Sequence, residues 1–521
     1  MGRTTEENLE SVMSGKSMLR LHNDVHGTML QEPVVGSFFD ELPCIDGYTA
    51  FESLCICSIE QAIKGKQIDV SGERCVFVVS TTKGNIWSSA ADSAKKIALY
   101  FGNGTEPVVV STACTSGVSA QMVAWRLLKA GEYDTAVVVG CDVQSEFIVS
   151  GFQSFKALSP ELCRPFDKDR KGLNAGEAAA TMVLSGKTEG KWHLLGGTIH
   201  NDANHISGPS RTAEGSWRCL EDMKKITGAE NWDMISVHGT GTIYNDEMES
   251  IALHRAGVDN VPVSAVKGYY GHTMGAAGLL ETILTMHALD EGVILPCKGY
   301  SEQGTTYKVN LSSEKRSTNG HTFIKLLSGF GGVNSAVAWT SSQEADVEDN
   351  CGGKGEWMNM GELTLTSSDN LKELYKANIG DYPKFYKMDR LSQLGFVGVE
   401  MLLKKTGVEL DGESTAIVMA NHTASLCNDT DYQATIEDKN NYFPSPALFV
   451  YTLPNIVTGE VAIRNHVFGE TAFYILPGED RMMPLIELTG MNPSVETIVA
   501  AWVECPDKAN YRAHFMLLMR K

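Results

Sequence analysis

The chain has 521 residues, of which 43% are hydrophobic and 21% are charged, and its formal net charge is −20. This composition is globular and excludes a mainly disordered or collagen-like chain, and the length allows two to four domains. No apolar run reaches the roughly 20 residues that a membrane span needs, and the N-terminus lacks a secretion-signal pattern. The negative charge argues against a general nucleic-acid binder, which needs a cationic surface.

The cysteines give a prediction about the compartment. The twelve cysteines are scattered without a Cys-x-x-Cys pair, and the two closest are Cys55 and Cys57. This pattern is neither a disulfide framework nor a zinc ribbon. We therefore expect a protein of the reducing cytoplasm.

Strands and helices are predicted to alternate along residues 1–342. Thr4 and Glu7 have capping-box spacing, which predicts a helix start. Further helices are expected at residues 46–64, 121–130 and 275–289. Near-continuous apolar runs, typical of strands buried on both faces, occur at residues 75–79, 108–111, 136–139, 261–266, 323–327 and 336–339. The alternation predicts an α/β core.

A linker and a second α/β unit follow. Residues 341–356 are polar, acidic and glycine-rich, which is typical of a linker. Residues 357–521, called the tail below, contain predicted strands at 363–365 and 416–419, an amphipathic helix at 391–403 and a periodic segment at 499–503. Residues 343–521 hold 15 basic and 26 acidic side chains, so negative charge is denser here than in the front of the chain.

Cys114 is the first candidate for chemistry. It follows the strand predicted at 108–111 and precedes the helix predicted from residue 121. A thiol at a helix N-terminus meets the positive end of the helix dipole and free backbone N–H groups, which favour the thiolate and lower the pKa. The alternative is a buried structural cysteine.

Three further motifs carry polar side chains or glycine turns. His238-Gly239-Thr240-Gly241-Thr242 comes directly after an apolar run, where the histidine is placed for hydrogen bonding in a cleft. Lys267, His272 and Glu281 share one segment. The glycine turn from Gly329 to Gly332 can aim a backbone N–H at an oxyanion. Each motif alone also fits core histidines, turn glycines or a surface lysine.

Together and in this order, the four motifs resemble the β-ketoacyl-acyl carrier protein synthases, the condensing enzymes of fatty acid and polyketide synthesis. Ala157-Leu158-Ser159, residues 164–172 and Gly176-Glu177-Ala178 support the resemblance, which covers about residues 1–342. The Cys-His-His set resembles the elongating type. The resemblance implies a duplicated thiolase-like α/β fold of layered helices and mixed sheets (α-β-α-β-α). Residues 1–186 and 187–342 would be its N- and C-terminal halves, and residues 343–356 the linker.

The resemblance also implies roles for the residues of the motifs. Cys114 would take the acyl group from a carrier protein, with an oxyanion hole formed by backbone N–H groups of Cys114 and Phe330, next to Gly331. His238 and His272 would bind the malonyl thioester carbonyl and promote loss of CO2. The structural and binding roles would fall to Lys267 and Glu281 (histidine loop), Phe152 and Phe330 (acyl-pocket gate), and Thr240 and Thr242 (phosphopantetheine arm).

The partners follow from the same resemblance. Lys156 would face an acidic acyl carrier protein, although a solvated surface lysine is an equal alternative. No metal and no soluble cofactor is implied, because phosphopantetheine arrives on the carrier. We expect a homodimer, or a heterodimer with a synthase-like partner.

The chain departs from the family pattern in three ways. The strand that normally precedes the Thr4 helix is absent, which would remove a core strand and leave a sheet edge open to pairing. Only 113 residues precede Cys114, so acyl-chain preference cannot be carried over. The tail resembles the N-terminal half of a synthase at residues 386–392, 416–421 and 445–455, but no cysteine occurs at 473–476, and Cys427 and Cys505 lie elsewhere. We therefore expect a non-catalytic half-synthase, with a merely structural domain as the alternative.

Three functions remain open at this point. The first is decarboxylative Claisen condensation of an acyl group on Cys114 with malonyl-acyl carrier protein, in fatty acid, polyene or polyketide synthesis. The second is a non-catalytic, chain-length-factor-like partner, against which the intact Cys114, His238, His272 and Lys267 argue. The third is an acyltransferase or hydrolase that uses Cys114 and His238 without condensation.

Overall fold

The computed structural model describes residues 1–187, 190–342 and 352–521, so residues 343–351 of the expected linker lie outside it. The first two helices begin at threonines. The Thr4 side chain accepts a hydrogen bond from the Glu7 N–H at the start of α1 (Thr5–Met13). Thr49 and Glu52 form a complete capping box at α2 (Ala50–Ile63). The predicted start at Thr4 is confirmed, whereas the second helix begins four residues later than predicted because its capping residue is Thr49.

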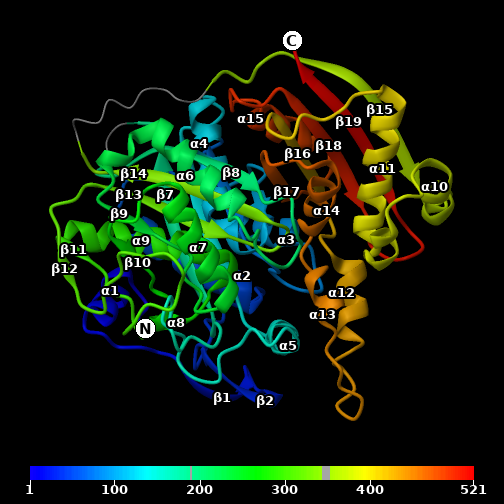
Figure 1. Cartoon of the computed structure of the whole chain (residues 1–521). Helices are drawn as coiled ribbons and strands as arrows, with labels where there is room; N and C mark the ends of the chain where they lie inside the picture. The colour runs from blue at the N-terminus through cyan, green and yellow to red at the C-terminus, as the bar shows by residue number, and fades with distance from the viewer. Residues whose placement is uncertain (188–189, 343–351) are drawn as a thin grey trace.

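The first 187 residues build four strands of one large sheet, with a small hairpin beside them. The strands are β3 (Cys75–Ser80), β4 (Val108–Val110), β5 (Thr135–Asp142) and β7 (Ala178–Ser185) in the order β4-β3-β5-β7. They are parallel except for β7. The hairpin of β1 (Arg20–Val25) and β2 (Thr28–Ser37) pairs with β6 (Ala175–Gly176) and projects from one end of the molecule (Figure 1). The three predicted strands of this region are confirmed.

Residues 190–342 build a second sheet of five strands. These are β8 (His193–Asn201), β9 (Met234–Ser236), β10 (Val263–Ser264), β13 (Thr322–Ser328) and β14 (Val333–Thr340), in the order β10-β9-β13-β14-β8. The predictions at 323–327 and 336–339 are confirmed. The run at 261–266 forms only the two-residue β10, because Pro262 has no N–H for a ladder. A short pair of β11 (Val293–Ile294) and β12 (Arg316–Ser317) lies outside this sheet.

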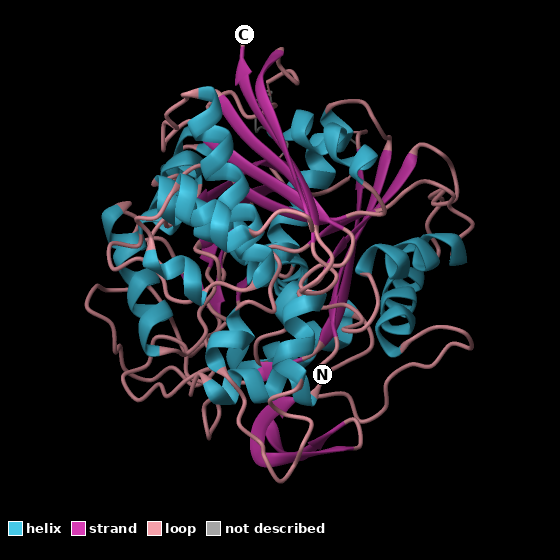
Figure 2. Ribbon diagram, turned by 90° about the vertical axis from the view of Figure 1, so that its right-hand side faces the viewer, coloured by secondary structure: helices cyan, strands magenta, loops and turns pink. Residues whose placement is uncertain are grey.

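Two helices lie between the sheets. α4 (Ser116–Lys129) and α9 (Ala277–Asp290) contact strands of both sheets. Gly117 and Gly278 allow the close approach of the two helices, since a Cβ on Gly117 would lie 3.0 Å from the Gly278 Cα. α2 and α3 (Ala90–Tyr100) cover the outer face of the first sheet, and α6 (Glu214–Thr227) covers that of the second. The predicted α-β-α-β-α layering is confirmed, and Figure 2 shows helices on both sides of the strands.

The tail contributes five more strands and has its own helices. Its strands are β15 (Trp357–Thr366), β16 (Thr415–Asn421), β17 (Thr471–Ile475), β18 (Thr497–Glu504) and β19 (Arg512–Arg520). Its helices are α10 (Leu371–Asn378), α11 (Arg390–Thr406), α12 (Leu426–Gln433), α13 (Pro446–Val450), α14 (Ile456–Asn465) and α15 (Met482–Thr489). The predicted strands at 363–365 and 416–419 and the helix at 391–403 are confirmed, and the periodic segment at 499–503 is β18.

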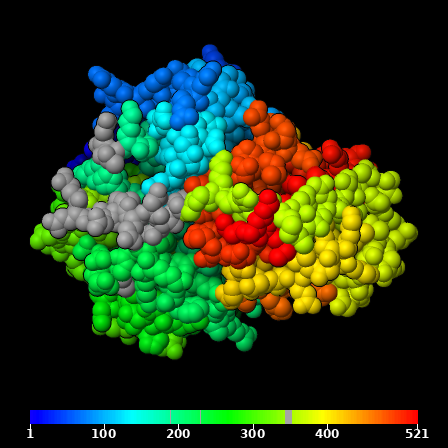
Figure 3. All heavy atoms as spheres, turned by 90° about the horizontal axis from the view of Figure 1, so that it is seen from above, coloured from blue at the N-terminus to red at the C-terminus, as the bar shows by residue number. Residues whose placement is uncertain are grey.

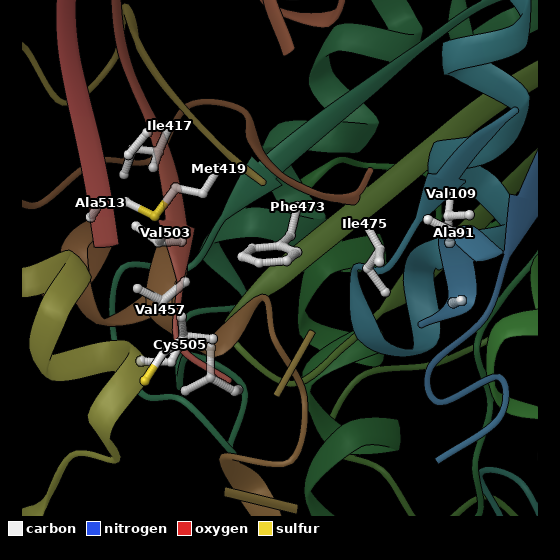
Figure 4. Close-up of a cluster of buried hydrophobic side chains, with 14 of the residues drawn as sticks. Ala91, Val109, Ile417, Met419, Val457, Phe473, Ile475, Val503, Cys505 and Ala513 are labelled. Carbon is white, nitrogen blue, oxygen red and sulfur yellow. The ribbon is translucent and has the colours of Figure 1, made fainter. Parts of the chain in front are cut away.

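The tail sheet continues the first sheet. β17 pairs antiparallel with β4 through Tyr474 opposite Val110 and Ile475 opposite Val109, which gives one sheet of nine strands. The apolar core crosses this junction from Ala91 and Val109 to Phe473 and Met419 (Figure 4). Figure 3 shows the tail, in yellow to red, packed against the rest of the chain. The tail and the first part therefore share one core.

Buried ion pairs also cross the junction. Arg126 on α4 binds Glu470 through two hydrogen bonds of 2.6 and 2.8 Å. Lys83 binds Asp429 at 2.8 Å. All four side chains are at most 6% exposed, so the junction buries charge as well as apolar surface.

The pairing at one sheet edge differs between the first 187 residues, on the one hand, and residues 190–342 and the tail, on the other. In the tail, the first strand β15 pairs antiparallel with the last strand β19, and in the second sheet β8 pairs with β14 in the same way. Among the described residues, β7 has no such neighbour and ends the nine-stranded sheet. In the described residues, the sheet edge that we expected to be open is that of β7. No helix in the described part of the chain is long and apolar enough to cross a bilayer.

Candidate active site

Cys114 lies in a strained turn between β4 and α4. The turn is a single 3-10 turn (Ala113–Thr115), and Ala113 has a φ of 52°, in the left-handed region. Such backbone strain in a non-glycine residue is characteristic of functional sites. Ser116 stabilises the turn, because its hydroxyl accepts from the Thr112 N–H and donates to the Ala113 carbonyl. The predicted strand–turn–helix setting of Cys114 is confirmed.

The expected low pKa of Cys114 is wrong. The residue stays partly accessible, but the protein crowds its sulfur, and this burial raises the pKa of the thiol to about 12. The positive charge of Lys267 lowers the pKa and the carboxylate of Asp142 raises it, and both effects are smaller than that of burial. Desolvation of the thiolate therefore outweighs the favourable helix N-terminus, and the thiol keeps its proton until a base accepts it.

Two imidazoles lie beside Cys114. His238 follows β9, and His272 lies between α8 (Lys267–Tyr270) and a 3-10 turn (Met274–Ala276). Their ring centroids are 4.9 Å apart and the rings are nearly perpendicular. Ligand atoms of Cys114, His238 and His272 all lie within 4.8 Å of one another. The structure therefore brings together the three residues that the sequence singled out.

Both imidazoles are neutral at physiological pH. Burial, followed by the positive charge of Lys267, lowers the pKa of His238 and of His272 well below the usual range. The Met274 N–H donates to Nδ1 of His272 over 3.2 Å, so the proton of the neutral ring is on Nε2. That Nε2 is buried and has no partner among the described residues. It is therefore a hydrogen-bond donor available to a bound oxygen.

Lys267 and Glu281 form the expected pair. Lys267 Nζ donates to Glu281 Oε1 and to the His238 carbonyl, each at 2.6 Å. The sequence analysis missed Lys325 on β13, whose Nζ binds the other oxygen of Glu281 and, at 3.1 Å, the Val237 carbonyl. Burial lowers the pKa of Lys325 to about 8. The signal was a lysine inside an otherwise apolar strand.

Two buried carboxylates that the sequence analysis missed hold the loops of the site. Asp142 accepts hydrogen bonds from the Thr81 hydroxyl at 2.6 Å and from the Gly275 N–H at 2.7 Å. Glu249 accepts from the N–H groups of His238 at 2.6 Å and Gly239 at 2.7 Å. They fix the backbone on both sides of the two histidines.

The glycine turn lies against Cys114. Residues 329–332, called the oxyanion turn below, connect β13 to β14, and Gly331 and Gly332 have φ values of 89° and 73°. A Cβ on Gly329 would lie 3.3 Å from the backbone nitrogen of Cys114. The two backbone segments of the expected oxyanion hole are therefore adjacent.

The expected gate residues belong to a larger aromatic cluster. The rings of Phe152 and Phe330 have centroids 6.5 Å apart. Phe155 lies 5.7 Å from Phe330, and Phe449 of the tail lies 5.4 Å from Phe152. The position of Phe155 three residues after Phe152 was a usable signal. Nothing local in the sequence places Phe449 here.

The expected binding residues have different environments. The hydroxyls of Thr240 and Thr242 are 2.9 Å apart, and Thr242 caps α7 (Ile243–Arg255). Thr240 is buried and its N–H donates to Asp246. Lys156 is exposed beyond the end of α5 (Glu146–Ser154). Thr240 and Thr242 are therefore in contact with each other, whereas Lys156 lies on a different element.

A thiol and two imidazoles can do two kinds of chemistry. They are ligands that Zn²⁺ accepts, and they are also a nucleophile with two neutral hydrogen-bonding partners. The position at the N-terminal ends of α4 and α9, beside a glycine turn, suits the second use. The fold and the site thus define a thiolase-like scaffold with a cysteine and two histidines gathered at a strand-to-helix turn.

Sequence comparisons define the family. Residues 66–190 match the β-ketoacyl synthase N-terminal domain and residues 193–301 match the C-terminal domain. This region of the chain therefore belongs to the β-ketoacyl synthase family. The 3-oxoacyl-[acyl-carrier-protein] synthase 2 of Mycobacterium leprae is 29% identical over 247 residues, covering 44% of this chain and 59% of that protein. Nodulation protein E of Rhizobium leguminosarum bv. trifolii is 30% identical, covering 44% and 61%.

A third relative is the putative polyketide β-ketoacyl synthase 1 of Streptomyces halstedii. It is 29% identical over 271 residues, which cover 48% of this chain and 64% of that protein. The chain thus spans about three fifths of the length of these relatives. Among solved structures, the keto synthase–chain length factor PfaC is similar over 99% of this chain and 77% of its own, with a TM-score of 0.80 at 14% identity.

A ketosynthase in complex with its chain length factor from Xenorhabdus doucetiae is similar over 66% of this chain and 95% of its own, with a TM-score of 0.57 at 24% identity. At these identities, the likeness to both structures shows the fold alone. The fold is that of the thiolase-like ketosynthases.

Proposed function

We propose that this protein is a β-ketoacyl synthase that condenses an acyl group on Cys114 with malonyl-acyl carrier protein, with loss of CO2. The observation that carries the proposal is the meeting of Cys114, His238 and His272 within 4.8 Å beside the oxyanion turn. A non-catalytic partner has no need of this arrangement. The names of the curated relatives, which include a 3-oxoacyl-[acyl-carrier-protein] synthase 2 and a putative polyketide β-ketoacyl synthase, support the same reaction class.

The first step is acyl transfer to Cys114. The sulfur attacks the thioester carbonyl of an acyl carrier protein and forms a new C–S bond, while the old C–S bond breaks and the carrier thiol leaves with the proton of Cys114. Backbone N–H groups of Cys114 and Phe330 stabilise the oxyanion of the tetrahedral intermediate. The raised pKa of the Cys114 thiol makes a neutral imidazole beside it the natural proton acceptor.

The second step is decarboxylative condensation. His238 and His272 donate hydrogen bonds to the malonyl thioester carbonyl, and the bond to the carboxylate breaks to give CO2 and an enolate. The enolate carbon attacks the acyl carbon on Cys114 and a C–C bond forms, while the C–S bond to Cys114 breaks. The released thiolate takes up one proton from water. The Nε2–H of His272 is suited to this task because it is buried and has no protein partner among the described residues.

The remaining site residues are assigned positioning and binding roles. Lys267 and Glu281 hold the His238 carbonyl and the histidine loop. Phe152 and Phe330 gate the acyl pocket, and Gly331 is the residue of the oxyanion turn next to Phe330. The phosphopantetheine arm of the carrier protein contacts Thr240 and Thr242, and Lys156 faces the acidic carrier. The reaction needs no metal and no soluble cofactor in this proposal.

The tail is assigned the place of a dimer partner. We propose that residues 1–186 and 187–342 are the two halves of the synthase, with a linker at 343–356, and that residues 357–521 are a non-catalytic half-synthase. The pairing of β17 with β4 supports this assignment, and it also means that a second copy cannot pair at that strand. The eleven cysteines of the described part are free thiols, which suits a cytoplasmic location.

Intact-protein mass spectrometry tests the proposal. The protein is mixed with a panel of acyl-acyl carrier proteins, and Cys114→Ala is treated in the same way. We expect a mass increase of one acyl group that is absent in the variant. A folded protein that no donor acylates would favour the alternative of a non-catalytic, chain-length-factor-like partner. Acylation without CO2 release from malonyl-acyl carrier protein would favour the acyltransferase or hydrolase.

A further inference from the structure

The tail contacts the oxyanion turn through one side chain. Asn455 precedes α14, is 2% exposed, and donates a hydrogen bond from Nδ2 to the Phe330 carbonyl over 2.8 Å. Gly331 and Gly459 make this approach possible. A Cβ on Gly331 would lie 2.5 Å from Asn455 Nδ2, and a Cβ on Gly459 would lie 2.5 Å from the Gly331 carbonyl oxygen. The first turn of α14 is therefore packed directly on the oxyanion turn.

The conformation of the oxyanion turn depends on such contacts. Gly331 and Gly332 have positive φ values. Because glycine adopts positive and negative φ about equally readily, these residues do not by themselves fix the conformation of the turn. Outside its own hairpin, three further hydrogen bonds hold the turn. The Gly331 N–H donates to the Ile206 carbonyl at 2.6 Å, Asn201 donates to the Gly331 carbonyl at 2.9 Å, and the Asp202 N–H donates to the Gly332 carbonyl at 2.7 Å. Among these contacts, only the hydrogen bond from Asn455 reaches the carbonyl of Phe330. Phe330 is the residue whose N–H is proposed to bind the oxyanion.

Asn455 makes this contact instead of the usual one for its position. An asparagine at a helix N-cap normally accepts a hydrogen bond from the first turn of its own helix, but the Asn455 side chain makes no capping bond. Its Oδ1 is buried and has no partner in the described part of the chain. A buried unpaired acceptor is unfavourable, so the residue does not serve its own helix.

The corresponding position in the first part behaves differently. α3 is the last helix before β4, just as α14 is the last helix before β17. The residue before α3 is Ser89, which does cap its helix by accepting from the Ala91 N–H. The Ser89 hydroxyl also donates to the His422 carbonyl at 2.7 Å. The sequence contains Gly-Phe-Gly-Gly once, in the oxyanion turn. Of the two helices compared, α14 faces this turn and is preceded by an asparagine that does not cap it, whereas α3 is preceded by a capping serine.

From these contacts we infer that Asn455 is a positioning residue for the oxyanion hole, so that the tail completes the active site of the first part. The inference rests on the proposed function. Its hydrogen bond fixes the Phe330–Gly331 peptide. This peptide adjoins the one that carries the Phe330 N–H, and its orientation sets the direction in which that N–H faces the oxygen of the tetrahedral intermediate. Small errors in the placement of such donors reduce rates strongly.

The test compares two reactions of the same sulfur in the full chain. Acylation of Cys114 passes through an oxyanion, whereas alkylation by iodoacetamide does not. Asn455→Leu removes the donor at similar volume. We expect it to slow acylation, by the carrier thioester that loads the wild type, about 10–100-fold. This is less than the loss of an oxyanion donor itself, because the Phe330 N–H is displaced rather than removed. We expect the alkylation rate to stay within about twofold, since no oxyanion donor is used.

The controls separate a positioning role from a structural one. Asn428→Leu is matched, because Asn428 is also a buried tail asparagine whose Nδ2 donates to a carbonyl, that of Leu448, at 2.8 Å. It should leave both rates unchanged. If Asn455→Leu does not fold, Asn455→Ser, which copies the residue before α3, is assayed in the same way. Wild-type acylation by the Asn455 variant, or equal loss of both reactions, would overturn the inference. A wild type that no donor acylates would refute the proposed function, and this inference with it.

Discussion

The backbone N–H of Met274 donates to Nδ1 of His272 over 3.2 Å, and this contact determines what His272 can do. This hydrogen bond leaves the proton of the neutral His272 ring on Nε2. That Nε2 has no partner in the described residues. His272 is therefore built as a hydrogen-bond donor to an oxygen in the site. Met274 itself has a φ of 52°, so strained backbone lies beside His272 as it does beside Cys114.

His272→Ala should therefore slow condensation about 100-fold or more, the range for the loss of one preorganised donor, and should change acyl loading much less. His272→Gln places an amide N–H near the position of Nε2 and should retain part of the condensation rate. Loading is followed by intact mass and condensation by CO2 release. Equal losses in both steps, or no difference between Ala and Gln, would contradict the donor role.

Lys325 should contribute to the acidic limit of activity. Burial is the largest cause of the lowered pKa of His238 and His272, the charge of Lys267 comes next, and the charge of Lys325 is a smaller cause in the same direction. Lys325→Met should therefore raise both pKa values. Protonation of the imidazoles would then begin at a higher pH, and the acidic limb of the condensation rate should move upward. The measurement is the rate from pH 5 to 8, with the exposed Lys168, paired with Glu302, changed to Met as control. Superimposable acidic limbs for Lys325→Met and wild type would refute the effect.

Alkylation of Cys114 should increase with pH without a plateau below pH 10. Burial raises the pKa of the thiol to about 12, so below that pH the thiolate fraction rises about tenfold per pH unit. The rate of iodoacetamide modification at Cys114, read by peptide mass spectrometry, checks this dependence. A plateau reached by pH 7–8 would mean that the helix N-terminus and Lys267 dominate over burial.

The junction between the tail and α4 should depend on the buried pair of Arg126 and Glu470. Glu470→Gln replaces the carboxylate that binds Arg126 with a neutral amide, in a site that is almost closed to solvent. Breaking a buried pair in this way costs about 3–5 kcal/mol, which should lower the denaturant midpoint clearly. Asp134→Asn, which breaks the exposed pair with Arg74, should leave the midpoint unchanged. Equal midpoints for both variants would show that the pair does not hold the junction.

Sequence motifs located most of the site because its chemistry is local. Cys114 and His238 each follow an apolar strand directly, and Lys267, His272 and Glu281 fall within one segment. Strand ends and helix starts converge at one edge of such a fold, so residues at those positions meet. Lys325 was missed because a single lysine in an apolar run has no local meaning until its burial is known.

The rest depends on contacts between distant segments. Phe449 and Asn455 reach the site only because β17 pairs with β4, and no pattern within the tail specifies that pairing. The pKa of Cys114 was predicted in the wrong direction for a similar reason. The helix N-terminus is visible in the sequence, whereas the desolvation that outweighs it is a property of the packed structure.

Product formation tests the central claim most directly. Wild-type protein is first loaded with an acyl group and then given malonyl-acyl carrier protein labelled in its free carboxylate. The account predicts one labelled CO2 and one β-ketoacyl-acyl carrier protein, longer by two carbons, for each acyl group consumed, and neither from Cys114→Ala. Loaded protein that releases only free acid, with the label still on the malonyl group, would contradict it.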